Sequence, residues 1–207
     1  DLIEEVARHF GYDRLPSRVR PAPPRVERDT LREKELTLSA RLVGLGYREI
    51  IPSSMVDPDE NARFTDAPPV VLANPLSQEA SALRSTPVPS MLRAMRWNLD
   101  RGQSDLRFFE VGKTYTRRVQ ALPDERRVLT LGLTGLRLPV PFFDADNPKA
   151  KRVEFFDLKG DLESLLSAFE IAGLRFEEGK LDCYEGGDAG RFVAGSQALV
   201  NFGRIRN

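Results

Sequence analysis

Histidine and cysteine are almost absent from this sequence, since His9 and Cys183 are the only ones among its 207 residues. A single cysteine excludes an intrachain disulfide, and one cysteine with one histidine excludes a Cys/His zinc site. A Ser-His-Asp set would depend on His9 alone, and no G-x-S-x-G turn is present. The lone cysteine suits a reducing compartment, so a cytoplasmic location is expected.

An excess of charge of either sign is also missing, because 31 Lys and Arg residues balance 31 Asp and Glu residues. No global basic field points to nucleic acid, so any such contact would be local. No apolar run reaches the roughly 18 residues of a membrane span and no signal peptide is visible, so no membrane partner is expected.

Nucleotide-binding loops are lacking as well. The run Gly112-Lys113-Thr114 has the end of a P-loop, but Arg107 stands where the first glycine of that motif would be. No G-x-G-x-x-G follows a predicted strand. A free-standing catalytic site is therefore not expected, and no catalytic residue is assigned.

Prolines crowd the segment after Pro16 and divide the chain. We interpret residues 1–16 as a small N-terminal remnant, 17–28 as a Pro-rich linker and 29–207 as the main domain. The first residues already follow a helical pattern and no Met precedes them, which suggests a piece excised from a longer protein.

Hydrophobic periodicity predicts an α+β domain with a mostly antiparallel sheet flanked by helices. A capping box of Thr30 and Glu33 opens one helix. Pro52 weakens one strand towards a sheet edge or a bulge. Helices are expected at 1–12, 30–45, 89–101 and 157–172, strands at 47–55, 70–73, 106–115, 127–135, 174–177 and 199–204, and a loop at 57–69.

Three carboxylates share one face of the first predicted helix. Asp1, Glu4 and Glu5 are spaced i, i+3 and i+4, and apolar residues cover the opposite face. Like charges this close favour a cation among them, and Mg²⁺ prefers oxygen ligands. Acidic residues in a first turn are also favoured by the helix dipole, so a plain solvated face is the alternative. Three carboxylates form only part of a magnesium shell.

Four blocks in collinear order resemble the β subunit of bacterial phenylalanyl-tRNA synthetase. DLIEEVARHFGYDRLP resembles the end of a small domain before the synthetase-like core, and LVGLGYREIIPSSMVDP the helix-to-strand entry of that core. LANPLSQEASALRSTPVPSMLRAMRWNLDRGQSDLRFFEVGKTY carries the Asn-Pro-Leu-Ser, Leu-Arg and Phe-Glu-Val-Gly blocks, and FFDLKGDLESLL resembles a later Lys-Gly helix. Under this resemblance, residues 1–16 end the small preceding domain and 29–207 form a C-terminally truncated core.

The resemblance implies a class II aminoacyl-tRNA synthetase fold that has lost its chemistry. The family pairs with a catalytic α subunit as an (αβ)₂ heterotetramer, and the α subunit uses ATP to charge tRNA(Phe) with phenylalanine. This chain would be a non-catalytic scaffold within that ligase and inactive alone. The family also holds Mg²⁺ with four β-chain carboxylates, three of which match Asp1, Glu4 and Glu5. With the fourth ligand upstream, a weak or empty site is expected here.

Some features depart from the family or leave alternatives open. Residues 187–192 lack the family's His-Pro-Gly turn. The helix Met91–Arg101, with Trp97, is a candidate docking face for the α subunit or ordinary core.

A stand-alone class II synthetase-like paralogue using ATP is one alternative function. A tRNA-binding module is another, through two basic patches: Arg14, Arg18, Arg20 and Arg25, and Arg117, Arg118, Arg126 and Arg127.

Overall fold

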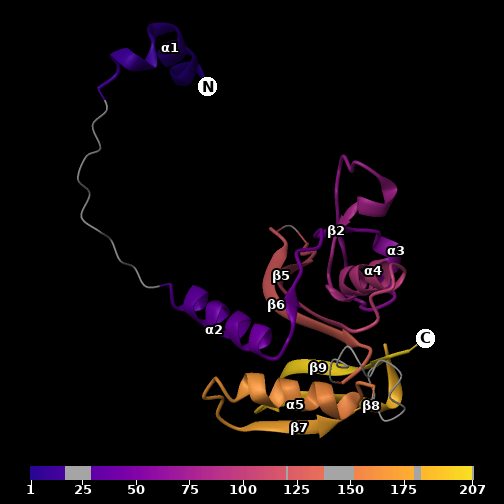
Figure 1. The fold of residues 1–207 in the computed structure, drawn as a ribbon. Helices are drawn as coiled ribbons and strands as arrows, with labels where there is room; N and C mark the ends of the chain where they lie inside the picture. Colours follow the sequence, from indigo (N-terminus) through magenta and orange to yellow (C-terminus); the bar gives the residue numbers. More distant parts are fainter. Residues whose placement is uncertain (17–28, 120, 138–151, 180–182, 207) are drawn as a thin grey trace. The chain divides into compact units, whose positions relative to one another are not determined.

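The computed structural model describes residues 1–16, 29–119, 121–137, 152–179 and 183–206 (Figure 1). The chain divides into two compact units, Asp1–Leu31 and Arg32–Asn207. The predicted Pro-rich linker, 17–28, lies outside the described residues. Within the described ranges, no helix is both long enough and apolar enough to cross a bilayer.

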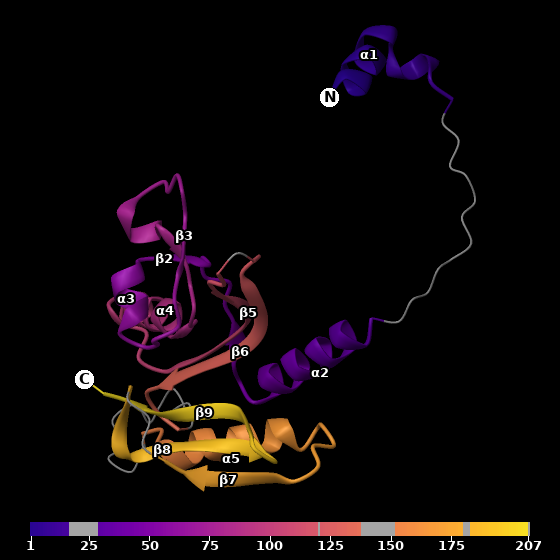
Figure 2. The same cartoon turned by 180° about the vertical axis from the view of Figure 1, so that it is seen from behind.

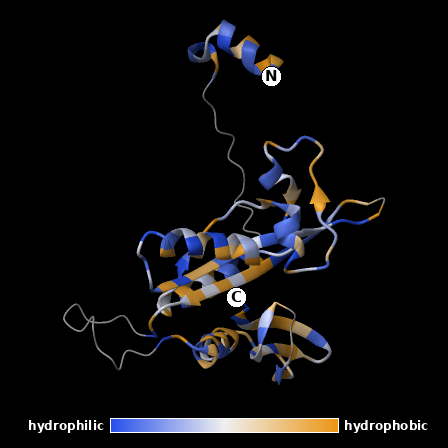
Figure 3. Ribbon diagram, turned by 90° about the vertical axis from the view of Figure 1, so that its right-hand side faces the viewer, coloured by the Kyte–Doolittle hydropathy of each residue, from blue (hydrophilic) through white to orange (hydrophobic). Residues whose placement is uncertain are grey.

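The first unit contains the predicted N-terminal helix. Helix α1 spans Leu2–Phe10, and the 3₁₀ turn η1 spans Tyr12–Arg14. Gly11, with a φ of +94°, ends α1 in a conformation that favours glycine. Hydrophobic and hydrophilic residues both appear along α1, beside the label N in Figure 3. No residue of α1 is buried, and Leu2 and Ile3 are exposed by 85% and 86%.

The second unit is built around a long antiparallel hairpin. Strands β5 (Leu106–Thr116) and β6 (Asp124–Thr134) pair along their whole length. Strand β1 (Arg48–Glu49) adds to β5 in parallel, giving the order β1-β5-β6. Alternation along β5 sends Phe108 to one face of this central sheet and Phe109 to the other. Both faces of the central sheet therefore carry apolar side chains that other elements must shield from solvent.

Two helices provide that cover. Helix α2 (Thr30–Gly44) packs Leu42 in a cluster with Phe109 and Leu165. Helix α4 (Val88–Leu99) packs Met91 and Met95 in a cluster with Phe108. Its approach to β6 is close because a Cβ on Gly132 would lie 2.7 Å from the Met95 Sδ. The central sheet is thus held between α2 and α4.

Two smaller sheets complete the second unit (Figure 2). One is antiparallel, in the order β2-β4-β3, with α3 and the 3₁₀ turn η2 in its connections. The other is antiparallel, in the order β7-β8-β9, and α5 packs on it through Leu162, Phe192 and Phe202. The bounds are β2 Met55–Val56, α3 Pro58–Ala62, β3 Val70–Val71, η2 Gln78–Ala80, β4 Ala82–Leu83, α5 Phe155–Leu166, β7 Leu174–Glu178, β8 Tyr184–Ala194 and β9 Gln197–Ile205.

Several predicted elements differ from the structure. The strand expected at 47–55 is two short strands, β1 and β2, because Pro52 lies between them and has no N–H for a ladder. The loop expected at 57–69 contains α3, which is capped by the Asp57 carboxylate. The Leu31 N–H bonds to Asp29 Oδ1 at 3.1 Å, so Asp29 rather than Thr30 precedes and caps α2. The strand β8 was not predicted, and α5 ends at Leu166 rather than at 172.

A buried tyrosine joins α5 to the central sheet. The Tyr47 hydroxyl donates to Asp161 Oδ2 at 2.8 Å, and Arg107 Nη1 donates to the same oxygen at 2.9 Å. Burial, followed by the hydrogen bond to Asp161, raises the pKa of Tyr47 far above its usual range. The neutral phenol is therefore favoured in the folded state more than in the unfolded chain.

Stability is expected to fall above pH 10 through this phenol. The unfolded chain then releases a proton that folded Tyr47 keeps, so the free energy of unfolding falls by about 1.4 kcal/mol per pH unit. Tyr47→Phe should remove this contribution to the pH dependence of the free energy of unfolding, which is measured by urea denaturation at pH values between 9 and 11.5. Tyr12→Phe, at a half-exposed position, is the control, and equal slopes in wild type and Tyr47→Phe would contradict the assignment.

Candidate functional site

The predicted magnesium ligands lie at the start of α1, with Asp1 at the N-cap and Glu4 and Glu5 in the first turn. Glu4 Oε2 is 3.7 Å from the amino group of Asp1, and Glu5 is paired with Arg8. All three acidic side chains are exposed. In the described part of the chain, no group of three or more His, Cys, Asp or Glu side chains is arranged to hold a metal ion. These residues alone do not fit a divalent-cation site, and the shared magnesium site stays a prediction.

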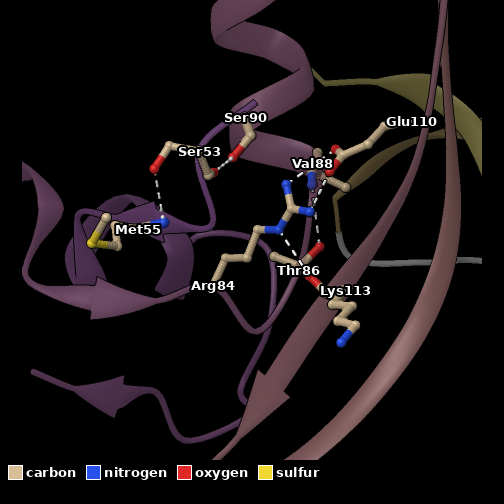
Figure 4. A network of polar contacts seen from close by, with 8 residues as sticks. All are labelled: Ser53, Met55, Arg84, Thr86, Val88, Ser90, Glu110 and Lys113. Carbon is tan, nitrogen blue, oxygen red and sulfur yellow. Dashed lines mark hydrogen bonds and ion pairs between the residues drawn. The ribbon is translucent and has the colours of Figure 1, made fainter. Parts of the chain in front are cut away.

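The face of the central sheet beneath α4 carries a buried ion pair (Figure 4). Arg84, directly after β4, is 1% exposed, and Glu110, in β5, is 4% exposed. Arg84 Nη1 donates to Glu110 Oε2 at 3.0 Å, and its Nη2 contacts Oε1. Arg84 Nε donates to the carbonyl oxygen of Lys113 at 2.9 Å. Both groups are thus desolvated and matched in charge, and most of their polar atoms have protein partners.

Gly112 leaves the space in which this pair forms. A Cβ at this position would overlap the Glu110 carboxylate and the Arg84 guanidinium. The Leu83-Arg84 and Phe109-Glu110-Val111-Gly112 blocks, which carry much of the family resemblance, therefore meet in space. The sequence prediction gave neither block a role. The available signal was Glu110, a charged residue inside an apolar predicted strand.

Buried polar groups around Arg84 fix the chain that leads into α4. The Arg84 N–H donates to Ser54 O at 3.0 Å, and the Tyr115 N–H donates to Arg84 O at 2.9 Å. Asn61, 1% exposed, accepts with Oδ1 from the N–H groups of Ser85 and Thr86 at 3.2 and 3.3 Å. The start of α4 is thereby tied to β5 and to α3.

An open cleft of about 1860 Å³ lies between α4, β6, α5 and β9. It is larger than the roughly 300–1,000 Å³ of small-ligand pockets. Arg93, Arg96 and Arg127 on its walls pair with Glu60, Asp100 and Glu35 respectively. Arg204 is also paired, with Glu185, whereas Arg63 and Arg152 have no carboxylate partner among the described residues. Four of the six arginines that line the cleft are thus not free to hold a triphosphate.

The remaining predicted surfaces are partly occupied by internal contacts. Arg118 and Arg126 both pair with Asp124 at 2.8 Å, which reduces the basic character of that patch. In the other patch Arg14 lies over the Phe10 ring at 5.7 Å, whereas Arg18, Arg20 and Arg25 lie outside the described residues.

Helix α4, the candidate docking helix, has one side buried in the core and one side exposed. Met91 and Met95 are core residues of α4, as its alternative interpretation expected. Trp97 is 56% exposed, with Arg101 stacked over its ring at 3.7 Å. Only the outward side of α4 therefore remains available for a partner.

A sequence model of the phenylalanyl-tRNA synthetase β chain CLM domain matches residues 15–207. The chain belongs to this family. The β subunit of phenylalanine–tRNA ligase from Thiobacillus denitrificans is 39% identical over 80% of this chain and 20% of its own length. The Pseudomonas fluorescens β subunit is 34% identical over 99% of this chain and 26% of its own length. The chain thus spans about a fifth to a quarter of these relatives.

The fold is similar to that of solved aminoacyl-tRNA synthetases. Pyrrolysyl-tRNA synthetase from Desulfitobacterium hafniense superposes with a TM-score of 0.62 at 18% identity. The match covers 97% of this chain and 64% of that one. At this identity the likeness establishes the architecture and no activity.

Removing one partner of the buried pair should destabilise the fold strongly. Arg84→Met leaves Glu110 charged and unpaired, which is expected to cost about 3–5 kcal/mol. Arg93→Met breaks the exposed pair with Glu60 and should cost under about 1 kcal/mol. The double variant Arg84→Met/Glu110→Leu should recover part of the loss, measured by urea denaturation. Equal losses in the Arg84 and Arg93 single variants would contradict this role.

Proposed function

We propose that this chain is a non-catalytic scaffold of phenylalanine–tRNA ligase that docks the catalytic α subunit in an (αβ)₂ assembly. In this proposal the α subunit uses ATP to charge tRNA(Phe), and the chain described here adds no group to the reaction. Membership of the β-chain family supports the ligase assignment. The observation that carries the docking role is a helix with apolar residues on two opposite sides.

Helix α2 has more apolar surface than its own domain uses. Leu38, Leu42 and Leu45 face the central sheet. Leu36 and Val43, one heptad apart, lie on the opposite side and are exposed by 54% and 60%. A helix at the surface of a monomer has one apolar stripe, so a second stripe indicates a second partner. Permanent interfaces bury such core-like surface.

The state of the charged groups supports a scaffold rather than a stand-alone enzyme. Arg84 lies on the sheet face beneath α4, where each of its three guanidinium nitrogens already contacts Glu110 or the Lys113 carbonyl oxygen. Class II activation of an amino acid needs free cations at the triphosphate. ATP–pyrophosphate exchange by the purified chain, abolished by substitution of its own arginines, would overturn the scaffold proposal.

Charges placed on the outer stripe of α2 should prevent docking. The chain is co-expressed with the catalytic α subunit of the same genome, and co-purification is measured. Leu36→Glu/Val43→Glu should reduce recovery of the α subunit by about tenfold or more, because two charges would be buried unpaired. Leu122→Glu, at an 88% exposed position outside α2, should leave recovery unchanged. Unchanged recovery for the α2 variant, with an unaltered melting temperature, would refute this docking face.

The magnesium assignment is part of the same proposal and is tested separately. This chain alone should show no saturable Mg²⁺ binding below millimolar concentration, because Glu5 is paired with Arg8 and no group of three or more His, Cys, Asp or Glu side chains among the described residues is arranged to hold a metal ion. In the complete gene product assembled with the α subunit, Glu4→Ala/Glu5→Ala should lower the bound magnesium measured by atomic absorption. Unchanged magnesium content there would show the ligand assignment to be wrong.

A further inference from the structure

The outer face of the β7-β8-β9 sheet presents three charged side chains in one cluster. Phe176 and Phe192 pair across β7 and β8 and pack towards α5. Alternation therefore sends Arg175, Glu177 and Arg191 to the opposite face. Glu177 pairs directly with Arg191 in the strand register, and Arg175 lies two residues along the same strand as Glu177.

Two guanidinium groups share the single carboxylate of this cluster. Arg191 contacts Glu177 Oε2 through Nε at 2.9 Å and Nη2 at 2.8 Å. Arg175 Nε donates to Glu177 Oε1 at 3.1 Å. Hydrogen bonds from Arg191 and then from Arg175 hold the pKa of Glu177 below its usual range. The carboxylate remains ionised near neutral pH, so one positive charge of the cluster is unbalanced.

The Glu177 carboxylate does not accept from every N–H donor of Arg175 and Arg191. It takes the Nε and Nη2 donors of Arg191 and the Nε donor of Arg175. Arg191 Nη1 and both terminal nitrogens of Arg175 have no acceptor among the described residues. Held in place by Glu177, two guanidinium forks thus keep several N–H donors for a further acceptor.

These residues border a hollow of about 190 Å³. Val193 and Ala198 contribute apolar wall, and the Gly195-Ser196 turn between β8 and β9 contributes the rim. The hollow has ample room for an oxyanion of five heavy atoms, since one water needs only about 10–15 Å³ by a comparable measure. The Ser196 hydroxyl supplies a further donor at the rim.

We propose that this hollow binds a phosphate group between Arg175 and Arg191. A phosphate offers the planar pairs of acceptor oxygens that guanidinium forks match, and its negative charge balances the surplus of the cluster. The group can belong to a free phosphate or to the backbone of a single-stranded RNA. The site uses no residue of the α2 docking face and none of the magnesium carboxylates, so it stands independently of the proposed scaffold role.

The test follows the Nε–Hε NMR signals of the two arginines in this chain. Inorganic phosphate should shift both signals saturably, whereas chloride at equal ionic strength should not. Ser196→Glu places a carboxylate at the rim and should weaken phosphate binding about tenfold or more, while Ser196→Gln should preserve it. Both substitutions lie in an exposed turn and replace none of the residues that form the ion pairs.

A second arm uses a short single-stranded oligoribonucleotide and distinguishes the source of the phosphate. If the RNA backbone occupies the site, Arg175→Gln/Arg191→Gln should weaken RNA binding and lower the salt slope by about 0.7 for one lost phosphate contact. Arg96→Gln, at an exposed arginine of α4 that also has a carboxylate partner, is the control. Phosphate shifts without RNA binding would identify a free anion as the ligand. The proposal fails if neither phosphate nor RNA distinguishes wild type from Ser196→Glu and from the double arginine variant.

Discussion

The buried pair of Arg84 and Glu110 is the constraint on which the second unit depends. Ions removed from water carry a large desolvation penalty, and only good geometry with further hydrogen bonds offsets it. Here Arg84 is held by Glu110 and by the Lys113 carbonyl oxygen, and Gly112 leaves room for both charged groups. Such a pair tolerates little displacement of β4 relative to β5. The chain that begins α4 is consequently fixed on the sheet, and with it the methionines that cover Phe108.

The sequence predicted elements with strong periodicity and failed where local chemistry competes. The strands β5 and β6 and the helices α2 and α4 were placed within a few residues, because their apolar patterns are long. Strand β8 was missed because its YEGGDAG start is rich in glycine, which is disfavoured in strands. It forms because Phe192 and Val193 bury themselves and because β7 and β9 pair on both sides. Tertiary pairing of this kind leaves little signal in one sequence.

The candidate sites were predictable to a smaller extent than the fold. Helical spacing correctly placed Glu4 and Glu5 in the first turn of a helix, with Asp1 at its N-cap, but spacing within a helix cannot supply ligands from elsewhere. The bond between Arg84 and Glu110 joins residues 26 apart in the chain, and no periodic pattern in the sequence predicts it. The family resemblance identified the blocks that contain both residues. Only the folded arrangement shows that the blocks meet, and why a glycine follows two residues after the glutamate.

Arginine–carboxylate clusters have opposite consequences in the two parts of the second unit. Around Arg84, one guanidinium meets one carboxylate in a buried place, so charge and most hydrogen bonds are matched internally and the group is unavailable to a ligand. Around Glu177, two guanidinium groups meet one carboxylate at the surface, with Arg175 and Arg191 exposed by 57% and 47%. The surplus charge and the free donors then face solvent. Stoichiometry and burial, rather than residue type, therefore separate a structural cluster from one suited to binding an anion.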